Sequence, residues 1–167
     1  KSLNIIRSRN TKVLYYDCTN YFFEIETEDE DDLENNKKGL RKYGKNKENR
    51  PLPIVEMGLF IDGNGYPLAF NLTPGNTNEQ TTLRPLEKQI MKDFNLSTFL
   101  VCTDAGLGSF SNRNFNNNGN RTYIVTQSIK QLSQEYQTDA LSDIGWRLVG
   151  SDKSINLSKI NKYDSKN

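Results

Sequence analysis

The stretch TFLVCTDAGL, residues Thr98 to Leu107, decides the fold of this chain. Its four apolar or near-apolar side chains, Phe99 to Cys102, are too few for a helix core and predict a strand that is buried on both faces. Gly106 and Gly108 break the pattern directly after Asp104. Open α/β sheets bind ligands where a parallel strand ends in such a turn, so Asp104 is the first candidate site residue. The alternative is that Asp104 only caps the helix after the strand.

Length and composition limit the class of protein. The 167 residues predict one domain, residues 1–167, and 34% hydrophobic residues with a mean hydropathy of -0.77 confine its core to a few segments. No window approaches the roughly 18 apolar residues of a membrane span, and residues 1–10 lack the apolar region of a signal peptide, so we expect a cytoplasmic protein without a membrane partner. The missing initiator Met and the polar residues 161–167 indicate a piece of a longer protein.

The composition also excludes several kinds of catalytic site. The chain contains 0 histidines, which excludes Ser-His-Asp hydrolysis, Cys-His proteolysis and His-ligated zinc within it. Its 2 cysteines cannot form a four-thiolate site. A catalytic metal ion would therefore rest on carboxylates, whose oxygen ligands select hard ions such as Mg²⁺ or Mn²⁺.

A second candidate acid lies in the stretch KVLYYDCTNYFFEIE, residues Lys12 to Glu26. This stretch is dense in aromatic and β-branched residues and has no Gly or Pro, so it predicts a strand. Asp17 lies in its middle, where a carboxylate is costly to bury unless a metal ion or hydrogen bonds compensate the charge. Asp17 is therefore a candidate site residue, and the alternative is that it lies on a solvated face of the strand.

A switch of charge follows this strand. Residues 24–34 contain eight acids and residues 37–51 contain seven bases, and neither block has apolar periodicity. Residues 27–50 therefore predict one long, mobile charged loop, whose acidic half is solvated and pairs loosely with its basic half. The basic half, with Tyr43 among its cations, could instead bind phosphates and stack on a base.

Residues Pro53 to Gln80 predict a hairpin, because two apolar runs flank the turn-forming residues Asp62 to Gly65. The turn faintly resembles a calcium loop, but the acids downstream have the wrong spacing. Pro67 lacks a backbone N–H, so the second arm should be an edge strand. Thr81 or Thr82 should then cap a helix, whose apolar face is formed by Leu83, Leu86, Ile90 and Phe94.

The remaining chain predicts a short helix over residues 110–115, a buried strand over 122–128, a helix over 129–140 and an extended piece over 145–150. The helix over 129–140 would carry Ile129, Leu132 and Tyr136 on one side. Three antiparallel strands followed by two parallel βα steps are the plan of a ribonuclease H-like α/β domain with a mixed sheet. Sequential adjacency and the right-handed crossover would then bring Asp17 and Asp104 together on neighbouring strands.

Strand alternation bears on the two cysteines. Cys18 follows Asp17 and should point to the opposite face of the sheet, whereas Cys102 shares the face of Asp104. A disulfide between them is therefore not expected, and both thiols should be free, as in the cytosol.

Several motifs in this order resemble the catalytic domain of bacterial insertion-sequence transposases of the Asp-Asp-Glu (DDE) kind, in the subgroup with a β-rich insertion before the Glu. The matching strings are KVLYYDCTNYFFEIE, GLRKYGKNKENRP, PLAFNLTPGNTNEQ and VCTDAGL, and the similarity extends roughly from Lys12 to Gly150. Asp17 matches the first acid of the family and Asp104 the second. The Glu motif has no match before Asn167, so residues 145–167 resemble the start of the insertion or a tail, and the domain is expected to be truncated within it.

The resemblance implies DNA transposition, in which two Mg²⁺ or Mn²⁺ ions support phosphodiester cleavage and strand transfer. Asp17 would bridge both ions, Asp104 would bind one of them, and the missing Glu would bind the other. The implied partners are the DNA of the element ends and of the target, and a second copy of the full-length protein in a homodimer. The candidate phosphate contacts, each of which could also be a solvated surface charge, are Arg41, Lys42, Lys45, Lys47, Arg50, Arg113 and Lys130.

Two other functions stay open. A nuclease of the same fold would cut DNA without joining it, and a non-catalytic DNA-binding remnant would agree with the missing Glu and with a net charge of only +1. We expect this chain alone to be inactive in strand transfer. If it is active, the third acid must lie within it, and the candidates are Glu135, Asp139 and Asp143 on or after the helix that follows the last predicted strand.

Overall fold

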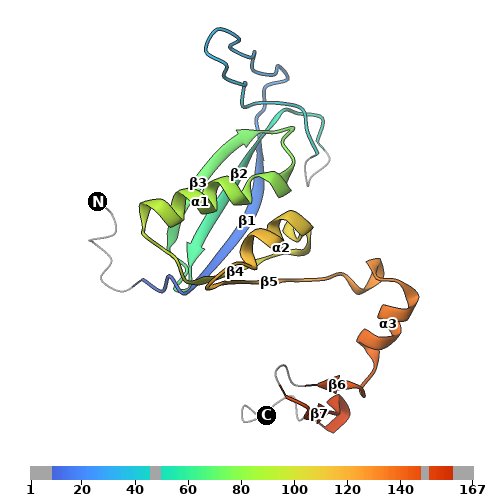
Figure 1. Cartoon of the computed structure of the whole chain (residues 1–167). Coiled ribbons are helices and arrows are strands. Elements are labelled where there is room, and N and C mark those ends of the chain that lie inside the picture. The colour runs from blue at the N-terminus through green and yellow to red at the C-terminus, as the bar shows by residue number, and fades with distance from the viewer. Residues whose placement is uncertain (1–8, 46–49, 148–150, 160–167) are drawn as a thin grey trace. The chain divides into compact units, whose positions relative to one another are not determined.

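The computed structural model describes residues 9–45, 50–147 and 151–159 (Figure 1). The sequence predicts one domain, whereas contacts group the chain into two compact units, Lys1–Thr126 and Gln127–Asn167. Each unit is therefore described by itself. No helix in the described parts of the chain is long and apolar enough to cross a membrane.

The first unit contains a mixed five-stranded sheet, so the expected α/β class is confirmed. The strand order is β3-β2-β1-β4-β5, with β2 antiparallel to both β1 and β3, and with β4 parallel to both β1 and β5. This is the expected succession of three antiparallel strands and two parallel steps. The strands are β1 (Val13–Phe22), β2 (Ile54–Asp62), β3 (Pro67–Pro74), β4 (Phe99–Thr103) and β5 (Arg121–Val125).

The hairpin of β2 and β3 forms where its turn residues predict it. Oδ1 of the buried Asp62 accepts hydrogen bonds from the backbone N–H groups of Asn64 and Tyr66, at 3.0 and 2.9 Å. Gly65 has φ +84°, a conformation that a glycine adopts without steric cost. β3 is an edge strand of the sheet, as the position of Pro67 predicts.

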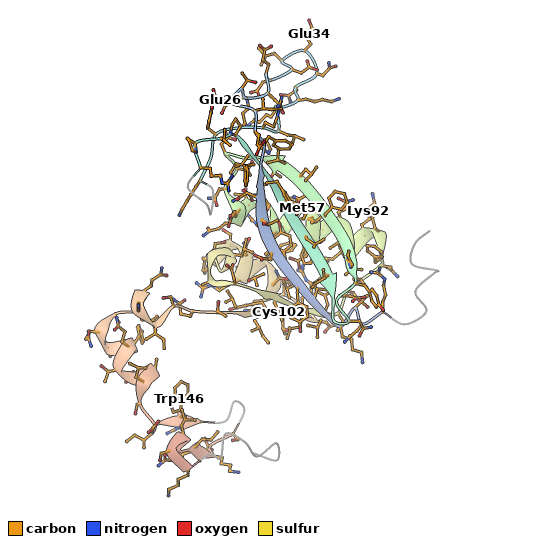
Figure 2. The ribbon with its side chains drawn as sticks, turned by 180° about the vertical axis from the view of Figure 1, so that it is seen from behind. Glu26, Glu34, Met57, Lys92, Cys102 and Trp146 are labelled. Atoms are coloured by element: carbon orange, nitrogen blue, oxygen red, sulfur yellow. The ribbon has the colours of Figure 1, made fainter. Side chains whose placement is uncertain are left out.

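The helices of the first unit cover one face of the sheet. They are η2 (Glu79–Thr81), α1 (Leu83–Asp93), η3 (Ala105–Leu107) and α2 (Phe110–Asn116). Leu83, Leu86 and Ile90 of α1 are buried in the core, as expected from their spacing. In Figure 1, α1 and α2 lie in front of the sheet, and in Figure 2 the same sheet is seen from the side away from them.

Thr82 precedes α1, but its side chain does not cap the helix as predicted. Its hydroxyl instead donates to the carbonyl oxygen of Glu79 and forms a buried hydrogen bond with Oη of Tyr16 on β1, both at 2.7 Å. Because the hydroxyl bonds to these two partners, it does not cap the N-terminus of α1. The result is a polar link between the start of α1 and the strand that carries Asp17.

The predicted burial of the parallel strands on both faces is wrong. Phe99 and Val101 of β4 are buried, but Leu100 and Cys102 are only half-buried, and in β5 only Arg121 is buried. The reason is that α1 and α2 lie on the same side of the sheet in the described part of this unit. Apolar side chains on the opposite face are therefore exposed to solvent, among them Tyr15, Tyr21, Phe70, Leu72 and Ile124.

The second unit has little buried apolar surface in its described residues. Its elements are η4 (Ile129–Gln131), α3 (Gln134–Leu141), β6 (Trp146–Arg147), β7 (Ser154–Ile155) and η5 (Leu157–Lys159). The predicted continuous helix over 129–140 is wrong, because Leu132 is extended, with φ -77° and ψ 157°, and Ser133 starts α3 anew as its side-chain cap. The predicted extended piece begins as β6, and its residues 148–150 lie outside the described part of the chain.

Candidate active site

A cleft of about 380 Å³ lies on the sheet face away from α1 and α2, and both candidate acids line it. Its polar lining residues include Asp17, Asp104 and Thr126. The rest of the wall is mainly apolar or aromatic. The full lining consists of Tyr15, Tyr16, Asp17, Leu59, Ile61, Cys102, Thr103, Asp104 and Thr126.

The strand register explains why the two acids meet. β1 and β4 are parallel, and the last paired residues between them are Tyr15 and Cys102. Two residues further along each strand lie Asp17 and Asp104, so both carboxylates leave the same face at the same level. Paired strands are about 4.8 Å apart, so Asp17 and Asp104 follow the ends of neighbouring paired segments.

Asp17 is exposed rather than buried. The predicted cost of burying its charge therefore does not arise, and the alternative of a solvated position describes its exposure correctly. Its Oδ1 accepts a hydrogen bond of 2.8 Å from the backbone N–H of Cys18. Tyr16 and Cys18 on either side are buried on the opposite face, and both bond to Thr82, so the strand is held firmly behind the carboxylate.

Asp104 caps the turn after β4, as the alternative interpretation predicts, and its role as a site residue stays a prediction. It is the N-cap of η3, and its Oδ1 accepts a hydrogen bond of 3.2 Å from the backbone N–H of Leu107. The residue is also exposed and lines the cleft with Asp17. Capping therefore orients the carboxyl group without removing it from the cleft.

The donor set of the cleft suits a hard divalent cation, because its nearest ligands are carboxylate oxygens. Within the described ranges, however, no group of three or more Asp, Glu, Cys or His side chains is placed to hold a metal ion. Asp17 and Asp104 supply the oxygen ligands that such an ion takes, but they do not by themselves make a complete site for two ions.

Two of the predicted phosphate-binding residues, Arg41 and Lys42, form ion pairs with acidic residues of their own loop. Residues 24–45, here called the charged arm, extend beyond the end of β1, with Glu34 near the far end (Figure 2). Nε of Arg41 donates to Oδ1 of Asp29 at 2.6 Å, and Nζ of Lys42 lies 2.9 Å from Oδ1 of Asp31. The hydrogen bonds from these cations hold the pKa of both carboxyl groups below its usual range. The acidic half of the arm therefore pairs with the basic half.

None of the other predicted phosphate contacts that the structure describes in the first unit lines the cleft. Lys45 lines a separate polar cleft with Glu56 and Glu79, and the guanidinium of Arg50 lies 4.2 Å from the ring centroid of Phe22. Arg113 is exposed on α2, whereas Lys130 belongs to η4 in the other unit. Lys47 lies outside the described residues.

The candidate third acids lie in the unit Gln127–Asn167. Glu135 and Asp139 are exposed on α3, and Asp143 is exposed just after it. Their part in the site stays a prediction.

The sequence interpretation placed Cys102 on the face of Asp104, but it missed Thr126 as a lining residue of the cleft. Thr126 was not recognised because the strand was expected to continue to Ser128, whereas β5 ends at Val125. The available signal was the same as for Asp104, namely a polar residue directly after an apolar strand. Both cysteines are free, as expected, with Cys18 buried and Cys102 half-buried.

Comparisons with known proteins do not assign the chain to a family. No family model matches the chain, and no curated protein matches it. Among solved structures, the chain is similar to the Mos1 transposase in a paired-end complex with the left transposon end, with a TM-score of 0.42 and 15% sequence identity. The match covers 74% of this chain and 37% of the Mos1 chain, so the chain spans little more than a third of that protein.

Proposed function

We propose that this chain is part of the ribonuclease H-like catalytic domain of a DNA transposase of the Asp-Asp-Glu kind, from the bacterial insertion-sequence subgroup with a β-rich insertion. One observation carries the proposal. Asp17 on β1 and Asp104 after β4 line one cleft at neighbouring parallel strands. Those are the two residues that match the first and second acids of the family.

In this proposal the two carboxylates hold Mg²⁺ or Mn²⁺ in the cleft. The ion, when bound, supplies charge stabilisation for an in-line phosphodiester displacement. The chain's own contribution is to present two oxygen ligands in a fixed orientation. The N–H of Cys18 orients the carboxylate of Asp17, and the N–H of Leu107 orients that of Asp104.

DNA is the proposed substrate, and a second copy of the full-length protein is the proposed partner in the complex. Two cations of the charged arm are neutralised within the arm, because Arg41 and Lys42 are paired with Asp29 and Asp31. With a net charge of +1 for the whole chain, we expect DNA binding to be weak.

Strand transfer by this chain alone is not part of the proposal. Two carboxylates can hold one hard ion, but a second ion needs a further acid. Since the described residues place no third acidic or thiol ligand with the pair, we expect the chain alone not to join DNA strands.

The test is the effect of Mn²⁺ on the melting temperature. An ion at about tenfold its dissociation constant stabilises the folded state by about 1.4 kcal/mol, which should raise the melting temperature by roughly 3 °C. Asp17→Asn and Asp104→Asn should each abolish most of this rise. Asp93→Asn, an exposed acid at the end of α1, is the matched control and should respond like the parent chain.

A rise in melting temperature that is identical in all four proteins would show that Mn²⁺ binds elsewhere, and it would overturn the proposal. Joined DNA products from the chain alone would instead show that a third acid lies within it. Glu135→Gln, Asp139→Asn and Asp143→Asn would then identify that acid by loss of joining. Metal-dependent cutting without joining in a complete protein would favour a nuclease.

A further inference from the structure

We propose that the hydroxyl of Thr126 is the phosphate-binding group of the cleft, donating a hydrogen bond to a phosphodiester oxygen of a DNA strand that lies across the strand ends. The inference rests on the proposed function and adds to it a residue that contacts the substrate.

The register places Thr126 in one row with the two acids. β4 and β5 are parallel, and their last paired residues are Thr103 and Val125. The next residues are Asp104 and Thr126, so Thr126 follows β5 at the level at which Asp104 follows β4. Together with Asp17 on β1, three neighbouring parallel strands present Asp17, Asp104 and Thr126 to the same cleft.

The three side chains in this row differ in how they can interact with a phosphate group. A carboxylate in its ionised form only accepts hydrogen bonds, and it repels a phosphate unless a cation lies between them. A threonine hydroxyl donates a hydrogen bond without carrying charge, and side-chain hydroxyls are common donors to phosphate oxygens. Thr126 is therefore the member of the row that can hold a phosphate oxygen directly.

The surroundings of Thr126 leave its hydroxyl available. The residue is exposed at the end of β5, and no side-chain hydrogen bond of Thr126 occurs among the described residues. Leu59, Ile61 and Cys102 of the cleft wall offer a phosphate no strong donor, whereas the hydroxyl-bearing Tyr15 and Thr103 lie two residues and one residue before the acids on their own strands. A DNA strand bound at Thr126 would lie beside the two carboxylates and would not contact them directly.

The test uses Thr126→Val, which keeps the shape of the side chain and removes the hydroxyl, and Thr126→Ser, which keeps the hydroxyl. The matched control is Thr122→Val, because Thr122 is exposed on the same strand and the same face but lies four residues away. The dissociation constant for a short fluorescent DNA duplex is measured by anisotropy with and without Mn²⁺, and the Mn²⁺ response of the melting temperature is recorded for each variant.

We expect Thr126→Val to weaken Mn²⁺-dependent DNA binding about tenfold, the loss of one hydrogen bond to a charged group. Thr126→Ser and Thr122→Val should bind like the parent, and the Mn²⁺ response should be unchanged in all three. Equal binding by Thr126→Val and Thr122→Val would overturn this inference alone. A weaker Mn²⁺ response in Thr126→Val would also overturn it, since the hydroxyl would then be an ion ligand. If the parent shows no Mn²⁺ response that depends on Asp17, both the proposed function and this inference fail.

Discussion

Nδ2 of Asn116 on α2 donates a hydrogen bond of 2.9 Å to Oε2 of Glu87 on α1, and both side chains are buried. Nη1 of Arg121, at the start of β5, lies 3.7 Å from Oε1 of the same carboxyl group. Both partners favour the ionised form, but burial outweighs them and raises the pKa of Glu87 to about 7. This cluster therefore connects two helices to the sheet through an acid that titrates near neutral pH.

The stability of the fold should depend on the protonation of Glu87. The pKa of this group rises on folding from 4.5 to about 7, so the folded chain keeps a proton that the unfolded chain releases between these values. The free energy of unfolding should therefore fall as the pH rises through this window, by on the order of 3 kcal/mol. Glu87→Gln should remove this part of the pH dependence, as measured by urea denaturation followed by circular dichroism.

Asp93→Asn, an exposed acid of the same helix, should keep the parental pH dependence and serves as the control. If Glu87→Gln and the parent lose stability equally between about pH 4 and about pH 8, a range that spans both pKa values, Glu87 is not the titrating group.

The charged arm should be cut first by trypsin, between Lys37 and Arg50, because its described residues bury little apolar surface. The double variant Asp29→Asn with Asp31→Asn should be cut there several-fold faster, since it removes the partners of Arg41 and Lys42. Mass spectrometry of the earliest products gives the sites and the rates.

The control for the arm is the double variant Glu30→Gln with Glu34→Gln, which makes the same change of charge at two exposed acids of the arm. Equal cleavage of the two double variants would mean that the ion pairs do not hold the arm. Early cleavage at Lys88 or Lys92 would mean that α1 opens before the arm does.

Thr82→Val should destabilise the first unit by about 1 to 3 kcal/mol, because it leaves the buried hydroxyl of Tyr16 without its partner at 2.7 Å. Thr81→Val is the control, since Thr81 is exposed and its hydroxyl bonds only locally to the carbonyl oxygen of Asn78. Thermal unfolding of both variants gives the comparison. Equal melting temperatures would show that the link between α1 and β1 contributes nothing measurable.

Cys102 should react with a maleimide much faster than Cys18. Burial raises the pKa of both thiols, which slows both reactions at neutral pH. Cys18 is only 2% exposed, however, and bonds to Thr82, whereas Cys102 lines the open cleft. Labelling of Cys18→Ser and Cys102→Ser, followed by mass spectrometry, separates the two rates. Faster labelling of Cys18 would contradict the assignment of Cys102 to the exposed face of the sheet.

The sequence by itself determined the elements whose signals are local. The turn residues from Asp62 to Gly65 predicted the hairpin, the spacing of Leu83, Leu86 and Ile90 predicted the buried face of α1, and Asp104 was found because it directly follows an apolar strand. Each of these signals lies within a few neighbouring residues, so a single chain segment contains all the information that is needed.

The tertiary structure alone decided what depends on contacts between distant segments. Coverage of only one sheet face left Asp17 exposed and made the expected burial of the parallel strands wrong. The register of β1, β4 and β5 brought Thr126 into line with Asp17 and Asp104, although the predicted strand ran past it. Register and coverage are set by pairing and packing between residues far apart in the chain, and a shift of one residue would turn each side chain to the other face. The periodicity of any one strand therefore could not reveal them.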